Sequence, residues 1–273
     1  MKVAVIGHVE WIEFVRVEHV PAAGEIVHAS ETWGEAAGGG AVAAVQLANL
    51  NGSVLLFTAL GHDDVGRRSL DQLRGQAVTV HAATAREPQR RGFTYVDAAG
   101  ERTITVLGDK LRPEGDDPTL PWEELLDADA VFFVSGDVAA LRQARKARVL
   151  VATARELPTL QRAGVGIDVL VASGEDEGER YRPGDLDPAP DVVVTTAGAL
   201  GGWIQPGGPY LAAALDGPLE DTYGAGDCFA AGLTFALGRG DALEAAVAFG
   251  ARCGAAVLTG RGPYGGQLRL VPD

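Results

Sequence analysis

Short apolar runs recur along the chain and alternate with segments of helical character. The runs are uninterrupted and rich in β-branched residues, which predicts strands buried on both faces. Buried strands that alternate with helices are typical of a mostly parallel sheet with helices on both faces. The predicted strands are 3–6, 54–58, 130–134, 149–152, 169–171 and 192–195, and the predicted helices between them are 41–50, 65–73, 139–147 and 157–163.

Two regions depart from this pattern. Residues 10–33 and 91–106 alternate apolar with polar positions, which predicts antiparallel strands with one face in water, and residues 96–101 predict a hairpin turn. Such strands, inserted in a parallel α/β chain, indicate a small β lid over a ligand site. We therefore expect one α/β domain over residues 1–273, with lid strands inserted at about 10–33 and 91–106.

Composition narrows the classes of partner. The net charge of −14 argues against nucleic acid, which binds basic surfaces. It leaves ATP open, because backbone amides and a metal can hold phosphates on an acidic protein. No apolar run reaches the ~18–20 residues that span a bilayer, and residues 1–7 predict a buried strand rather than a secretion signal. We expect a cytoplasmic protein without a membrane partner.

The segment from Asp221 to Asp227 (Asp-Thr-Tyr-Gly-Ala-Gly-Asp) carries the main chemical signal. It precedes a predicted helix, and amides at a helix start can bind an anion. Asp227 could then take a proton from a hydroxyl while the amides hold the phosphoryl group. The alternative is an ordinary turn with Asp227 in solvent. The apolar, small-residue segments 230–237 and 243–258 favour the first interpretation, because buried helices would fix the loop in place.

This segment, completed by Cys228 and Phe229, resembles the second signature of the PfkB (ribokinase-like) carbohydrate kinases. Other motifs of that family follow the same order along the chain. They are Gly38-Gly39-Gly40 before residues 41–50, Gly61-His62-Asp63-Asp64-Val65-Gly66, and Thr196-Ala197-Gly198-Ala199-Leu200-Gly201. The resemblance implies a ribokinase-like fold and an ATP-dependent kinase that phosphorylates a hydroxyl of a sugar or sugar-like acceptor.

The resemblance also implies roles for particular residues. Asp227 is the catalytic base, and Gly224, Ala225 and Gly226 form the anion hole. Glu177 is a candidate ligand of the Mg²⁺ that accompanies ATP, although Gly174 stands where the family has an Asn. Asp221 is the candidate for a monovalent cation such as K⁺. The candidate nucleotide-binding residues are Thr196, Gly198, Gly201, Thr222 and Gly254.

The acceptor side departs from the family. Ile12 and Ala43 stand where typical members have an Asp and an Asn that bind sugar hydroxyls. Glu10 and Glu13 are candidate replacements, and the amides of Gly38 and Gly39 could also meet the acceptor. Basic residues of the lid either steer an anionic acceptor or are simply surface charges: Arg90, Arg91 and Arg102. The five histidines show no triad or metal spacing and are interpreted as structural.

Two further functions stay open. Loss of the two sugar contacts leaves a nucleoside kinase of the same family as one alternative. A non-catalytic protein that binds a nucleotide or metabolite on this fold is the other. In related kinases the lid can also carry a homodimer contact, and the two cysteines, Cys228 and Cys253, are predicted to be buried thiols.

Overall fold

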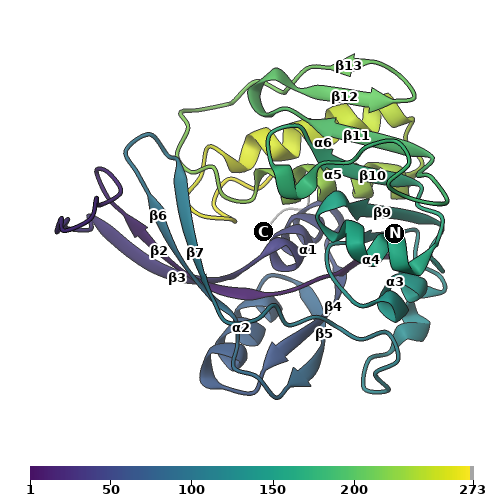
Figure 1. Cartoon of the computed structure of the whole chain (residues 1–273), viewed down its shortest axis with the longest axis horizontal. Coiled ribbons are helices and arrows are strands. Elements are labelled where there is room, and N and C mark those ends of the chain that lie inside the picture. The colour runs from purple at the N-terminus through teal and green to yellow at the C-terminus, as the bar shows by residue number, and fades with distance from the viewer. Residues whose placement is uncertain (271–273) are drawn as a thin grey trace.

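A computed structural model describes residues 1–270 (Figure 1). Its main sheet has nine strands, parallel from β11 to β5, with β12 and β13 added antiparallel at one edge. In spatial order these are β13 (Pro209–Tyr210), β12 (Gly202–Gln205), β11 (Val192–Thr196), β10 (Val169–Ser173), β9 (Val149–Thr153), β8 (Ala130–Phe133), β1 (Val3–Ile6), β4 (Val54–Gly61) and β5 (Val78–Ala85). The predicted parallel α/β fold is confirmed, and β5, β12 and β13 are strands that the sequence pattern did not indicate.

Helices cover both faces of this sheet. Alternate side chains of β1 enter two separate cores, Val3 and Val5 on one face and Ala4 and Ile6 on the other. The first core is closed by α1 (Gly39–Asn51), α2 (Asp64–Arg74), α5 (Ala225–Arg239) and α6 (Leu243–Val257), and the second by α3 (Val138–Ala144), α4 (Leu157–Ala163) and the short helix η1 (Trp122–Leu125). Among residues 1–270, every helix is too short or too polar to cross a lipid bilayer.

Helix α5 packs closely against α6. A Cβ on Gly232 would lie 2.6 Å from Sγ of Cys253, so only glycine allows this approach. Cys228 and Cys253 are both buried free thiols, as predicted. Because α5 begins at Ala225, this packing fixes the position of the loop that precedes it, residues 221–224.

The lid is a second sheet, which extends from one side of the main body (Figure 1). Its order is β3 (Glu31–Ala37), β2 (Glu10–Arg16), β6 (Arg91–Val96) and β7 (Arg102–Leu107). The expected antiparallel lid is confirmed by the pairs β2–β3 and β6–β7, and a parallel pairing of β2 with β6, which was not expected, joins these two pairs. Residues 17–30 form an irregular connection rather than strand.

Gln89 joins the lid to the main sheet. Its side chain is buried, donates to the Val9 carbonyl (2.7 Å) and accepts from the Gly61 amide (3.0 Å). A Cβ on Gly61 would lie 2.1 Å from the Gln89 nitrogen, so the end of β4 and the start of β6 are in direct contact. The Gln89 side chain thus connects the end of β4 with the segments that lead into the lid strands β2 and β6.

Gln89→Ala should therefore destabilise the protein. It leaves a buried amide and a buried carbonyl without partners, each of which costs about 1–3 kcal/mol. Urea denaturation measures the change, and Gln161→Ala, which removes one exposed hydrogen bond to Asp185, should alter the free energy of unfolding by less than ~0.5 kcal/mol. Equal effects of the two variants would contradict the role of Gln89.

Candidate active site

The candidate site lies where the end of β1 meets the start of α1. The Gly40 amide donates to the His8 carbonyl (3.1 Å), and a Cβ on Gly7 would lie 2.7 Å from Cα of Gly40. Two chain segments can pass this close only because both residues are glycine. The carboxyl ends of β8, β9 and β10 lie along the same edge of the parallel sheet.

Asp227 faces this junction from the first turn of α5. The helix begins at Ala225 and is preceded by Gly224 in the left-handed region (φ 84°), so the first amides lack intrahelical acceptors. A Cβ on Gly39 would lie 2.8 Å from Oδ1 of Asp227, whereas a Cβ on Gly226 would meet nothing within 4 Å. The starts of α1 and α5 therefore converge on the Asp227 carboxylate, and the chain beside Gly226 is open to a ligand.

The electrostatic environment suits Asp227 to accept a proton. Its side chain is half-buried, and replacement of water by protein raises the pKa of Asp227 to about 7. This value includes a smaller rise from the charge of Glu179 and the opposing effects of Arg102 and Arg155. A carboxylate with a pKa near the working pH is suited to general base catalysis.

Glu10 lies on the acceptor side of the junction. A Cβ on Gly38 would lie 3.1 Å from Cγ of Glu10, and the Glu10 carboxylate pairs with Arg90 (3.0 Å) and approaches Nε2 of His8 (3.5 Å). Burial raises the pKa of Glu10, and the charges of Arg90 and Lys110 oppose this. The structure thus brings Glu10, Gly38, Gly39 and Asp227 together.

The other acceptor candidates lie elsewhere. Glu13 lies on the face of β2 opposite to Glu10, because the two are three residues apart and strand side chains alternate between faces. There Glu13 accepts a hydrogen bond from Nε1 of Trp11 (2.7 Å). Ile12 is fully buried and lies against Gly92 of β6, and Ala43 is fully buried in α1. At the two positions where sugar-binding residues are expected, this chain has core side chains.

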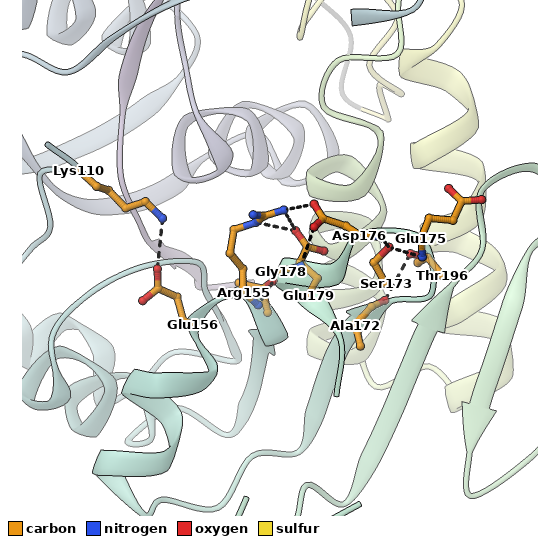
Figure 2. Close-up of polar contacts among 11 residues, drawn as sticks. Lys110, Arg155, Glu156, Ala172, Ser173, Glu175, Asp176, Gly178, Glu179 and Thr196 are labelled. Atoms are coloured by element: carbon orange, nitrogen blue, oxygen red, sulfur yellow. Dashed lines mark hydrogen bonds and ion pairs between the residues drawn. The ribbon is translucent and has the colours of Figure 1, made fainter. Parts of the chain in front are cut away.

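The acidic loop after β10 is organised by Arg155, which follows β9 (Figure 2). Arg155 pairs with Glu179 through Nε (2.7 Å) and also with Asp176. Glu177 is exposed and pairs with Arg180 (3.3 Å) instead. Of the two glutamates, Glu179 is the one whose charge acts on Asp227. Over residues 1–270 no group of three or more His, Cys, Asp or Glu side chains is arranged to hold a metal.

The candidate nucleotide residues divide into two groups. Thr196 is the last residue of β11. Gly198 lies beside Glu175, since a Cβ on Gly198 would lie 2.9 Å from Oε1 of Glu175. Gly201 and Gly254 serve packing, because a Cβ on either would meet a backbone oxygen, Tyr210 O at 2.1 Å or Ala225 O at 3.1 Å. The buried hydroxyl of Thr222 has no hydrogen-bond partner.

Asp221 is fully buried in the loop that precedes α5. Its oxygens accept from the amides of Tyr223 (2.8 Å) and Gly262 (3.1 Å), and burial raises its pKa. Each oxygen keeps a further lone pair, so a cation could bind beside these two bonds. The Arg102 guanidinium of β7 donates to the neighbouring Thr222 carbonyl, which ties the lid to the same loop.

Sequence reasoning does not identify a group of charged residues at this edge. It assigns His8 a structural role, which stays a prediction, and it gives no role to the basic residues outside the lid. The group is His8, Lys110, Arg112, Arg155 and Glu156. The available signal was position, since His8, Arg155 and Glu156 follow directly after strands that end at the ligand edge of the sheet.

Comparisons with known proteins show which family and which fold the chain resembles. A family model described as "pfkB family carbohydrate kinase" matches residues 1–268. An ATP-dependent ribose-1-phosphate kinase of Halopiger xanaduensis is 31% identical over 276 residues, 93% of this chain and 91% of that protein. Ribokinase from Thermotoga maritima superposes with a TM-score of 0.79 at 20% identity (98% and 96% of the two chains), and a nucleoside kinase from Methanocaldococcus jannaschii with 0.74 at 17% (98% and 95%).

Asp227→Asn should stabilise the protein at neutral pH. The pKa of Asp227 is raised to about 7 in the folded state and is about 3.9 in an unfolded chain. Between these values the folded state binds the extra proton, so wild-type stability falls as pH rises from about 4 to about 7. Asn carries no such proton. The melting temperature of the variant should exceed that of the wild type by a margin that grows across this window and then stays constant; a margin independent of pH would contradict the raised pKa.

Proposed function

Because the chain belongs to the pfkB family of carbohydrate kinases, we propose that it transfers the γ-phosphate of ATP to a hydroxyl of a sugar that already carries a phosphate. The main support for this reaction is that Asp227, in the first turn of α5, lies against Gly39 at the start of α1. The positive side chains on the acceptor side, together with the named activity of the Halopiger relative, support the phosphorylated acceptor.

In this proposal Asp227 takes the proton of the attacking hydroxyl. The amides of Ala225 and Gly226 hold the transferring phosphoryl group, since they lie at the positive end of α5 and Gly226 has no side chain in the way. Because Gly39 has no side chain, the Asp227 carboxylate can lie against the start of α1, where the acceptor would meet it. The lid strands would exclude water, which otherwise would compete as the acceptor.

The nucleotide and ions occupy the remaining parts of the site. ATP would lie beside Thr196, Gly198 and Thr222. A Mg²⁺ bound with it would neutralise phosphate charge. Glu179, whose charge acts on Asp227, is better placed to meet such an ion than the exposed Glu177. A K⁺ ion fits beside Asp221, whose buried carboxylate retains unused lone pairs.

The acceptor is inferred from charge. With Ile12 and Ala43 in the core, the usual contacts to sugar hydroxyls are absent from these positions. Glu10 can accept from vicinal hydroxyls, while Arg90 beside it and the charges around His8 favour an anion. A pentose phosphate fits this combination better than a neutral hexose or nucleoside does.

Asp227→Ala should reduce kcat by about 10²–10⁴-fold, the usual contribution of a general base. ADP formation with Mg-ATP and ribose 1-phosphate measures the rate, with an acceptor-free reaction as background. Asp216→Asn, an exposed carboxylate on the preceding loop, provides the matched control and should retain wild-type turnover. Near wild-type turnover of Asp227→Ala would exclude it as the base.

The activity should also depend on pH on the acidic side. The pKa of Asp227 is raised to about 7, and the base acts only when it is deprotonated. The value of kcat/KM should therefore fall about tenfold per pH unit below that pKa. A profile that is flat from pH 5.5 to 8 would contradict the assignment.

The same assay separates the alternatives. ADP formation with nucleosides and none with sugar phosphates would favour a nucleoside kinase. Nucleotide binding without turnover of any sugar, sugar phosphate, nucleoside or polyol would favour a non-catalytic binding protein. The raised pKa of Asp227 favours the enzyme, because a binding protein needs no base.

A further inference from the structure

A second charged cluster lies where the chain returns from the lid to the main sheet. Lys110 and Arg112 follow β7 and flank Leu111, which is buried in the core. Both contact the same oxygen of Glu156, Lys110 at 3.3 Å and Arg112 at 3.8 Å. Figure 2 shows the Lys110 ammonium directed at Glu156, on the side of Arg155 away from the acidic loop.

This cluster is held rigidly. Glu156 is almost fully buried, and its second oxygen accepts from the Thr159 hydroxyl (3.3 Å). The chain after Arg112 is anchored at the start of α3, where Asp137 accepts from the amides of Gly115 (2.9 Å) and Ala140 (2.7 Å). The Lys110 side chain is only 18% exposed. Lysine side chains are rarely buried to this extent, so we infer that the Lys110 ammonium has a role other than that of a surface charge.

The cluster has more positive than negative charge. Lys110 and Arg112 share one carboxylate, Glu156, and Arg90 and His8 share another, Glu10. His8 is itself buried, and its Nδ1 has no partner. Burial and the nearby charges of Lys110, Arg90 and Arg112 lower the pKa of His8, so the ring is neutral and can still donate one hydrogen bond. An anion would supply the missing negative charge.

We propose that Lys110, Arg112 and His8 form the subsite for the phosphate that the acceptor already carries, with Arg90 beside it. This assignment rests on the proposed function. A phosphate dianion has oxygens enough to accept from all of these donors, and charge-assisted bonds of this kind are the strong ones. Glu156 keeps the two cations oriented when the subsite is empty.

The subsite lies at the end of the acceptor away from the reacting hydroxyl. The Asp227 carboxylate lies against Gly39, whereas Glu10 and the His8 ring lie against the neighbouring Gly38, 3.1 and 3.2 Å from its Cβ position. The site therefore extends from Asp227 past Gly38 to His8, and Lys110 and Arg112 are among the charges that act on His8. The acceptor is a sugar with its phosphate at one end and a free hydroxyl at the other, such as a pentofuranose 1-phosphate with a free primary hydroxyl.

Lys110→Met and Arg112→Gln test the subsite in the full-length protein. Each should raise KM for ribose 1-phosphate by about 10–100-fold, the loss expected for a charge-assisted hydrogen bond. KM for ATP should change less than about twofold. Lys146→Met and Arg74→Gln remove exposed cations and serve as matched controls. Lys110→Met/Glu156→Gln repeats the test without leaving a buried carboxylate unpaired.

Calorimetric titration with ribose 1-phosphate in the absence of ATP separates the two proposals. Binding that weakens in Lys110→Met supports the subsite, even if the wild type transfers no phosphate and the proposed function fails. Turnover of ribose 1-phosphate with unchanged KM in both variants would overturn the subsite and leave the function standing. A rise in KM for ATP alone would also overturn it, since the cations would then belong to the nucleotide. Neither binding nor turnover of ribose 1-phosphate by the wild type would overturn both.

Discussion

The close approach of the α1 and α5 termini to the end of β1 is the constraint on which the site depends. Gly7, Gly39 and Gly40 leave no room for a side chain, so the chain segments pass at backbone distance and the Asp227 carboxylate is pressed against Gly39. The same closeness removes water from the carboxylate and raises its pKa. Packing of small residues thereby shapes the proposed chemistry, because the glycines that bring the helices together also place Asp227 where its pKa is raised to about 7.

The lid and the main sheet share charged residues at this junction. Arg102 of the lid binds the loop before α5, Arg90 binds Glu10, and Gln89 joins the first lid strands to β4. A lid fastened in this way to the main sheet and to the loop before α5 would be well suited to couple acceptor binding with the exclusion of water. Charge on the lid also affects Asp227, since Arg102 opposes the rise in its pKa.

Much of the fold was predictable from sequence, since apolar runs and glycine motifs act locally. The core strands, the helices around them and the start of α5 follow from such patterns. β5 (Val78–Ala85) was missed because its half-buried edge position breaks the apolar run. The parallel pairing of β2 with β6 depends on contacts between distant segments, and no local pattern reports them.

The site was predictable only where a motif fixes backbone geometry. Asp227 and Gly39 belong to such motifs and lie together in the structure. Side-chain direction was harder: Glu10 and Glu13 were equal candidates, and the strand alternation directs only Glu10 to the site. Glu179 rather than Glu177 acts on Asp227 because of how the loop folds around Arg155.

The most direct test of the central claim is a crystal structure of Asp227→Asn with a non-hydrolysable ATP analogue and ribose 1-phosphate. The account predicts the γ-phosphate on the amides of residues 225 and 226, with an acceptor hydroxyl within hydrogen-bond distance of residue 227. A γ-phosphate or acceptor bound away from this turn would contradict it.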